Sequence, residues 1–261
     1  MDKVAVPAPF DLTLSVVSHG QIELISQLLQ DIETHCHGFA LELVLTLNIP
    51  EAVHLDLKHY SYPVRVISNT VPRGFGANHN QAFKSSQSRN FCVLNPDIRL
   101  HTNPFPQLVA LLDDPAIGVV APLVLSPQGV IEDSARRFPT LKKIAEKLIK
   151  RQSSSDYVLN VNPVDIDWVA GMFMVFPHAI FDQIKGFNER YFLYYEDVDI
   201  CVRLHLAGLR VVVCSGAKVV HDAQRTSHRN FKYLRWHLRS MLRFLTSAES
   251  RQIQRLKRLR R

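Results

Sequence analysis

The sequence predicts an α/β fold, with a mostly parallel sheet covered by helices on both faces. Short runs of β-branched and aliphatic residues alternate with segments of helical spacing, which is the element order of a parallel sheet. Polar residues directly follow several of these runs, as at the carboxyl ends of strands where ligands bind. Hydrophobic residues make up 46% and charged residues 21% of the 261 residues, which is typical of a globular chain with a full core.

Four strands are predicted in the first part of the chain, each a short apolar run. They cover residues 12–17, 41–47, 64–67 and 91–94. Helical spacing predicts one helix over 21–34 and another over 76–86. Because parallel strands end at one edge of the sheet, the polar residues that follow them are expected to lie close together: Ser18, His19, Asn69 and Asp97.

The second part of the chain is less regular. Residues 126–165 are predicted to form an irregular excursion over the ligand-binding edge. A strand pair is expected over 166–176, followed by a helix that starts at Pro177 and ends near Gly186. A further helix over 196–207 is closed by Gly208, which suits the left-handed position after a helix. Residues 209–214 form another predicted strand.

The positive charge is concentrated at the C-terminus. The chain has a formal net charge of +7, and residues 225–261 hold twelve Lys or Arg against one acid, a net +11 that leaves −4 for residues 1–224. Apolar residues recur at three- and four-residue steps from Phe231 to Leu245, with Arg235, Arg239 and Arg243 at steps of four, which predicts a basic amphipathic helix. Two interpretations stay open, packing on the domain and docking on an anionic membrane. Residues 255–261 are expected to be frayed.

Other features predict a cytoplasmic protein. No apolar run reaches the roughly 18 residues of a spanning helix, and residues 1–10 lack the apolar core of a signal peptide. The four cysteines are scattered without a Cys-x-x-Cys pair. Reduced thiols are therefore expected, and neither disulfides nor a zinc site.

Two motifs around the predicted edge can bind phosphates. Asp97 in Asn95-Pro96-Asp97 can hold a divalent cation that bridges two phosphates, although Asn, Pro and Asp also favour plain turns. The segment from Arg73 to Asn80 follows a strand and opens a helix, so its glycines allow close approach of a ligand and its helix N-terminus favours anions. It has neither the P-loop nor the dinucleotide-binding pattern.

The acidic run Glu196-Asp197-Val198-Asp199 stands at the start of a predicted helix, after an aromatic-rich stretch. The helix dipole favours acids there by about 0.3–1 kcal/mol each, and Asp199 can pair with Arg203 four residues on. An acid under aromatic cover can also act as a general base. Since residues 197 and 199 lie about 200° apart around a helix, only one of them can face a given substrate atom.

His221 ends a late strand and is followed by Arg225. A single histidine is either structural or a ligand. Arg225 is either a phosphate clamp or the start of the basic tail.

Taken in order, these motifs resemble those of the family 2 inverting glycosyltransferases, in particular the bacterial rhamnosyltransferase-like branch. The resemblance extends from about residue 11 to 228 and is most specific over 186–203. The other matching pieces are residues 73–80, 94–97, 168–174 and the segment around His221.

The resemblance implies a GT-A fold, with a nucleotide-sugar-binding part over about 1–125, an acceptor-binding part over about 126–228 and a basic tail over 229–261. It implies that Asp97 and His221 hold Mg²⁺ or Mn²⁺, and that Asp197 is the base with Glu196 beside it. The donor contacts that it implies are Ser18, His19, Asn48, Arg73, Gly74, Gly76, Asn80, Asn95, Asp97 and Arg225. The acceptor contacts that it implies are Trp168, Gly171 and Tyr195.

The implied activity is transfer of a sugar from a nucleotide-diphosphate donor to a glycan or lipid-linked acceptor, in the synthesis of a bacterial surface polysaccharide such as a lipopolysaccharide O-antigen. A dTDP-rhamnose donor is indicated by the resemblance alone. Asn48 stands where many relatives have Asp, and His19-Gly20 where they often have Tyr-Asn, so the nucleobase stays open. The tail would dock the enzyme on the inner face of the plasma membrane.

Three rival functions fit the sequence less well. A nucleotidyltransferase needs a Gly-rich N-terminal loop with Lys or Arg, which residues 16–20 do not supply. Nucleic-acid binding needs a basic stripe with aromatics in the body of the protein, so no nucleic acid is expected. An inactive glycosyltransferase-like binding module stays open, and the presence of Asp97, Asp197 and His221 together argues against it.

Overall fold

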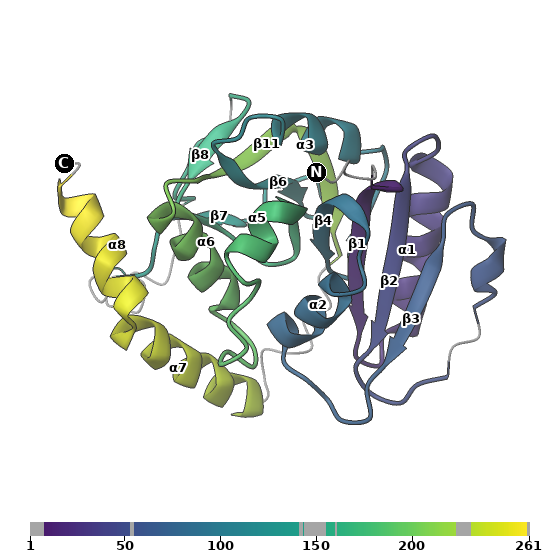
Figure 1. Ribbon diagram of the computed structural model, residues 1–261, viewed down its shortest axis with the longest axis horizontal. Helices are drawn as coiled ribbons and strands as arrows, with labels where there is room; N and C mark the ends of the chain where they lie inside the picture. The colour runs from purple at the N-terminus through teal and green to yellow at the C-terminus, as the bar shows by residue number, and fades with distance from the viewer. Residues whose placement is uncertain are drawn as a thin grey trace, which may run out of the picture.

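The computed structural model describes residues 8–52, 55–140, 143, 155–159, 161–222 and 231–259. In this part of the chain a central sheet carries helices on both faces, as the sequence predicts (Figure 1). The strand order is β3-β2-β1-β4-β10-β6-β11-β5, and β8 pairs with β11. The strands are β1 (Phe10–Ser18), β2 (Leu41–Leu47), β3 (Val64–Ser68), β4 (Ser88–Leu94), β5 (Ile98–Arg99), β6 (Ile117–Leu125), β8 (Val164–Ile166), β10 (Phe173–Pro177) and β11 (Arg210–His221).

Six strands of this sheet run in one direction. Strands β1 to β4 pair in parallel, and so do β6 and β11. Strand β10 lies antiparallel between β4 and β6 and joins the two parallel groups. The predicted strand pair over 166–176 is therefore wrong: β8 pairs with β11, β10 pairs with β4 and β6, and β9 (Trp168–Val169) pairs with β7 (Ala135–Arg136) in a separate small sheet.

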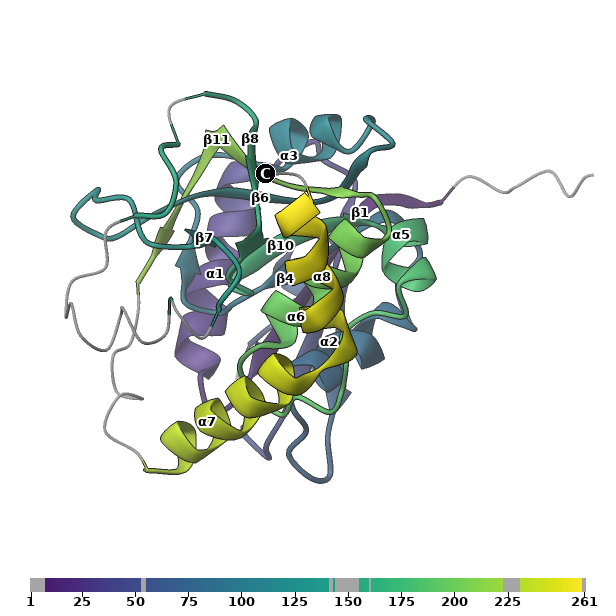
Figure 2. The same ribbon diagram turned by 90° about the vertical axis from the view of Figure 1, so that its left-hand side faces the viewer.

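Two hydrophobic layers hold the helices on the sheet. Residues such as Ile25, Leu28 and Phe105 pack α1 and α3 on one face, and Phe181 and Ile200 belong to the layer on the other face, beneath α2, α5 and α6 (Figure 2). The helices are α1 (Ile22–His35), α2 (Phe75–Phe83), α3 (Phe105–Leu111), α5 (His178–Gln183), α6 (Glu196–Leu206), α7 (Phe231–Thr246) and α8 (Ala248–Leu259), with a 3₁₀ turn at Leu57–His59.

The last strand is longer than predicted. Strand β11 does not end at Cys214 but continues to His221, across an irregularity in its pairing with β6 between Cys214 and Lys218. This extension carries His221 to the edge of the sheet where β4 ends. All four cysteines of the chain are buried and unpaired.

The basic tail forms two helices, where the sequence predicted one. Helix α7 ends at Thr246, and the Ser247 hydroxyl accepts the N–H of Ser250 at 3.0 Å, which caps α8. Ser250 and Ile253 are buried, and α8 packs against α6 (Figure 2). The expectation of fraying is wrong for residues 255–259, because Lys257 pairs with Asp167 and the helix continues to Leu259. None of the helices in the described ranges is both long and apolar enough to cross a membrane.

Candidate active site

Asp97 and His221 meet at the carboxyl edge of the sheet. Asp97 follows β4, and β5 then pairs antiparallel with the end of β11 so that His221 lies opposite Ile98. His221 Nε2 lies 3.2 Å from Asp97 Oδ2. The N–H of Asp222 donates to the Asp97 carbonyl at 2.9 Å. The fold thus brings together the two residues predicted to bind a cation.

Glu132 completes this cluster from the irregular segment after β6. Its Oε2 lies 2.7 Å from His221 Nδ1, so the imidazole stands between two carboxylates. Burial opposes a charged ring, but the hydrogen bonds to Asp97 and Glu132 outweigh it and raise the pKa of His221 to about 9. The imidazole is thereby fixed in orientation, with Nε2 directed to Asp97.

The cluster suits a divalent cation. Oδ1 of Asp97 is buried and finds no hydrogen-bond partner in the part of the chain that the structure describes. A metal-binding histidine commonly donates its other ring N–H to a carboxylate, which is the relation of His221 to Glu132. Among the residues that the structure describes, no three His, Cys, Asp or Glu side chains are arranged to hold an ion by themselves.

A strained turn precedes the acidic run. Tyr194 and Tyr195 have φ angles of 69° and 68°, a left-handed conformation that aromatic residues rarely adopt. Such backbone strain clusters at functional sites. Helix α7 supports the turn, because Ser240 donates to the Leu193 carbonyl at 2.9 Å and the Tyr195 ring packs on Phe244.

Asp197 is held by backbone N–H groups. Oδ2 accepts the N–H of Gly171 at 3.1 Å, and Oδ1 accepts the N–H of Val198 at 2.8 Å. Burial raises the pKa of the Asp197 carboxyl, while these two N–H groups and the charge of Arg136 act in the opposite direction. The result is an oriented carboxylate with a raised pKa, which suits a general base.

Glu196 and Asp199 have different surroundings. Glu196 is 4% exposed, and its Oε2 has no hydrogen-bond partner among the residues described. Burial, followed by the charge of Asp197, raises the pKa of Glu196 well above its ordinary value, so its neutral form is favoured. Asp199 pairs with Arg203 at 2.8 Å, which confirms the pairing that the helical spacing predicted.

Asn48 organises the loop that follows β3. Its Oδ1 accepts the N–H of Arg73 at 2.8 Å and the side-chain amide of Asn69 at 3.0 Å. Its Nδ2 donates to the Arg73 carbonyl at 3.0 Å and lies 3.3 Å from His19 Nδ1. Nearby, the Ser18 hydroxyl accepts the N–H of Gln21 at 3.1 Å. Asn48 therefore positions the expected donor residues His19 and Arg73 with its own hydrogen bonds.

Gly74, Gly76 and Asn80 serve packing in this structure, where the sequence suggested approach to a ligand. A Cβ on Gly74 would lie 2.7 Å from the Phe192 carbonyl oxygen, and one on Gly76 would lie 2.5 Å from Phe187 Cβ. Asn80 exchanges two hydrogen bonds of 2.8 Å with the Phe187 backbone. These contacts fix α2 against the loop that leads to the acidic run.

A family model described as glycosyltransferase like family 2 matches residues 52–242. The match takes in Arg73, Asp97, Asp197 and His221 and covers well over half of the chain. This chain belongs to that family. The family membership inferred from the ordered motifs is thereby confirmed.

Two relatives and a solved structure are similar to this glycosyltransferase. It is 26% identical to rhamnosyltransferase WbbL of Escherichia coli strain K12 over 88% of this chain and 90% of that one. It is 31% identical to the N-acetylglucosaminyl-diphospho-decaprenol L-rhamnosyltransferase of Mycobacterium tuberculosis over 60% of this chain, and it spans about half of that enzyme, 55%. The crystal structure of GalNAc-T7 with UDP, GalNAc and Mn²⁺ matches with a TM-score of 0.68 at 14% identity, over 85% of this chain and 45% of that one. This likeness confirms the GT-A fold.

The remaining predicted site residues of the glycosyltransferase lie as follows. Trp168 is 9% exposed, and its Nε1 donates to the Arg137 carbonyl at 3.0 Å. The Arg136 guanidinium lies over the Trp168 ring, 5.4 Å from its centroid, so the indole supports the position of Arg136. Asn95 donates its N–H to the Met172 carbonyl at 2.9 Å. Arg225 lies outside the described residues.

The sequence did not reveal Glu132, Arg136 or the strained turn at Tyr194 and Tyr195. Glu132 and Arg136 lie in a segment with no regular pattern, and the left-handed pair involves residues that usually avoid this conformation. One available signal was the pair Arg136-Arg137 in a body that is otherwise acidic.

Proposed function

We propose that this glycosyltransferase moves a sugar from a nucleotide-diphosphate donor to a hydroxyl of a glycan or lipid-linked acceptor in bacterial surface polysaccharide synthesis, with inversion at the anomeric carbon. The proposal is carried by two arrangements on neighbouring backbone segments, since the N–H of Asn95 donates to the Met172 carbonyl at 2.9 Å. Asp197 is an oriented carboxylate held by the N–H of Gly171, and Asp97 and His221 form a cluster of cation-ligand type.

Asp97 and His221 would hold Mg²⁺ or Mn²⁺, with Glu132 orienting the imidazole. When bound, the cation neutralises charge on the leaving diphosphate. Support comes from the buried and unpartnered Oδ1 of Asp97. GalNAc-T7, which shares the fold, was crystallised with Mn²⁺.

Asp197 would accept the proton of the acceptor hydroxyl while its oxygen attacks the anomeric carbon. The N–H groups of Gly171 and Val198 orient the carboxylate and stabilise its ionised form. Glu196 favours its neutral form, and Asp199 is occupied by Arg203. Asp197 is therefore the member of the acidic run best suited to this role, and Glu196 supports its position.

The donor is proposed to be dTDP-rhamnose, with contacts from the loop that Asn48 organises. Support comes from two relatives that are named as rhamnosyltransferases. The mycobacterial relative's name also specifies a diphosphate-linked lipid acceptor, and we place the same class of acceptor beside Asp197. Trp168, Gly171 and Tyr195 belong to the acceptor side of this arrangement.

The outer face of α7 is proposed to dock on an anionic membrane at the inner face of the plasma membrane. It exposes an apolar stripe, which we call the α7 stripe: Phe231 (88% exposed), Leu234 (54%), Leu238 (45%) and Leu242 (61%). The exposed Arg235 and Arg239 lie beside it, about 100° further around the helix. An apolar stripe flanked by cations fits an interfacial helix, and each such cation contributes about 1 kcal/mol near an anionic surface.

A panel of nucleotide-sugars, each incubated with a lipid-linked acceptor with and without Mn²⁺, tests the function. We expect product with one donor, dependent on the metal, and an inverted linkage by NMR. Metal-dependent thermal stabilisation by a nucleotide without turnover on any acceptor would favour the inactive binding module. Release of diphosphate from a sugar phosphate and a nucleoside triphosphate would favour a nucleotidyltransferase.

A further inference from the structure

The segment from Glu132 to Arg136 connects the two halves of the site. Glu132 contacts His221 at one end. At the other end β7 pairs with β9, with Arg136 opposite Trp168. The N–H of Ala170 donates to the Ser134 carbonyl at 2.8 Å, and the next residue, Gly171, donates to Asp197. Arg136 is therefore carried on a backbone that is hydrogen-bonded to Ala170, the residue before the Gly171 partner of the proposed base.

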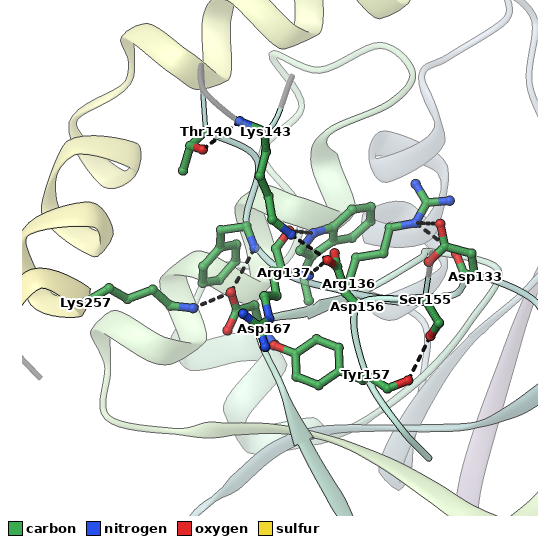
Figure 3. A network of polar contacts seen from close by, with 12 residues as sticks. Asp133, Arg136, Arg137, Thr140, Lys143, Ser155, Asp156, Tyr157, Asp167 and Lys257 are labelled. Atoms are coloured by element: carbon green, nitrogen blue, oxygen red, sulfur yellow. Dashed lines mark hydrogen bonds and ion pairs between the residues drawn. The ribbon is translucent and has the colours of Figure 1, made fainter. Parts of the chain in front are cut away.

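The Arg136 guanidinium is fixed on one side and open on the other. It lies over the Trp168 ring, and its Nε donates to the Asp133 carbonyl at 2.8 Å and contacts the Asp133 carboxylate at 3.0 Å. Figure 3 shows the guanidinium turned toward Asp133 through Nε, while its two Nη atoms carry no dashed line. The side chain is 35% exposed. Among the described residues only Nε of this guanidinium has a hydrogen-bond partner, and a preoriented edge with such Nη donors is a fork for a phosphate or carboxylate.

Arg137, the next residue, faces a different set of groups. Its guanidinium lies over the Tyr157 ring at 5.7 Å, and its backbone N–H donates to Asp156 at 2.9 Å (Figure 3). Strand β7 ends at Arg136, and the Arg137 guanidinium contacts Tyr157 where that of Arg136 contacts Trp168. Arg137 is consequently a matched control for Arg136, with the same side chain among different neighbours.

Two further observations place Arg136 at the site. Its positive charge acts on both Asp197 and Tyr195, lowering the pKa of each group against the opposing effect of burial. The hydroxyl of Ser134, two residues earlier, is buried at 1% exposure and has no hydrogen-bond partner within the described ranges. Buried polar atoms normally have partners, so Ser134 offers a second donor on the same short segment.

We propose that Arg136, assisted by Ser134, is a phosphate-binding residue that grips a diphosphate group of a bound substrate next to Asp197. This inference rests on the proposed function for the identity of the substrates. The diphosphate has two possible sources, the nucleotide of the donor and the lipid diphosphate of the acceptor. With either source, the anionic oxygens of the diphosphate would lie against the segment from Glu132 to Arg136.

Binding without turnover tests the proposal. Calorimetric titration of the full chain uses three probes: inorganic pyrophosphate, a nucleoside diphosphate with Mn²⁺, and farnesyl diphosphate as a minimal lipid diphosphate. We expect Arg136→Gln to weaken pyrophosphate binding by about 10- to 100-fold, Arg136→Lys to weaken it less, and Arg137→Gln to bind like the wild type. A loss confined to the nucleotide assigns the donor diphosphate, and a loss confined to farnesyl diphosphate assigns the acceptor.

The proposal is overturned if Arg136→Gln binds all three probes as the wild type does, or if the wild type binds none of them. If Arg136→Gln lowers the melting temperature, diphosphate binding by Arg136→Lys and Ser134→Ala decides whether the proposal holds. Both of these variants keep the charge of the segment. The readout is independent of catalysis. A chain that transfers no sugar but loses diphosphate binding in Arg136→Gln would refute the proposed function and leave this assignment standing.

Discussion

The imidazole of His221 lies 3.2 Å from the carboxylate of Asp97, although the two residues are separated by 124 positions in the chain. The contact depends on the antiparallel pairing of β5 with the end of β11, and Glu132 holds the other ring nitrogen. This arrangement makes the role of each of the three residues separable by experiment.

We expect His221→Ala to abolish the effect of Mn²⁺ on nucleotide binding, and Glu132→Gln to weaken metal affinity by about 10- to 100-fold, as loss of a histidine's hydrogen-bond partner does in metal sites. Titration of Mn²⁺ followed by electron paramagnetic resonance measures both. His101→Ala, at an exposed position, is the control. Unchanged Mn²⁺ affinity in His221→Ala would remove the histidine from the site.

Asp197→Asn is expected to lower kcat by about 10²- to 10⁴-fold, because a general base is lost while the hydrogen bond from Gly171 can be kept. Thermal unfolding and donor binding should stay close to wild type. Asp182→Asn, at a carboxylate that is 67% exposed, should leave kcat unchanged. Near-normal turnover by Asp197→Asn would exclude it as the base.

Leu234→Glu with Leu238→Glu should strongly reduce sedimentation with vesicles that contain anionic lipid, since both side chains belong to the α7 stripe. Leu259→Glu is the matched control, because this leucine is 84% exposed and lies at the end of α8, away from the stripe. Equal binding of wild type to neutral and anionic vesicles would count against docking through cations.

Gly76→Ala should destabilise the fold by about 1–3 kcal/mol, as overpacking of a core contact does, because the new Cβ would lie 2.5 Å from Phe187 Cβ. Gly216→Ala should cost less, since its nearest neighbour is the flexible end of Gln107. Denaturant unfolding compares the two. Equal losses in the free energy of unfolding would show that the 187–192 loop shifts easily to accept the new Cβ.

Stability should fall in acid because of His79. The His79 ring is buried, with its Nδ1 2.8 Å from Oγ of Ser15. Burial lowers the pKa of the ring to about 3. Between the unfolded pKa of about 6.5 and the folded value, the unfolded chain binds a proton that the folded chain excludes, so the free energy of unfolding decreases as pH falls. The slope contributed approaches about 1.4 kcal/mol per pH unit. Urea unfolding at several pH values should show a flatter dependence in His79→Gln, and an equal slope would contradict this account.

The sequence predicts the parallel part of the fold and the main acidic groups of the site. Strands β1 to β4 and helix α6 follow from local periodicity and from end signals such as Gly208. Asp97 was expected at the sheet edge because it directly follows a strand. The family membership rests on motifs that are continuous in sequence, above all residues 186–203.

What the sequence missed depends on distant contacts. Strand β10 pairs antiparallel with both β4 and β6, and no local sequence pattern reports the direction of a strand. The contacts of Glu132 with His221 and of Arg136 with Trp168 join segments that lie far apart in the sequence. The packing of Gly74 and Gly76 becomes visible only when the 187–192 loop lies against α2.

The two sides of helix α7 have different surroundings. Its inner side holds Leu193 through Ser240 and packs Phe244 on Tyr195, immediately before the acidic run, and its outer side exposes the α7 stripe. A helix with its side chains is about 10–12 Å across. Whatever surface covers the stripe is therefore kept at a fixed height from Asp197. The helix would thereby select acceptors by the distance between their reacting hydroxyl and that surface.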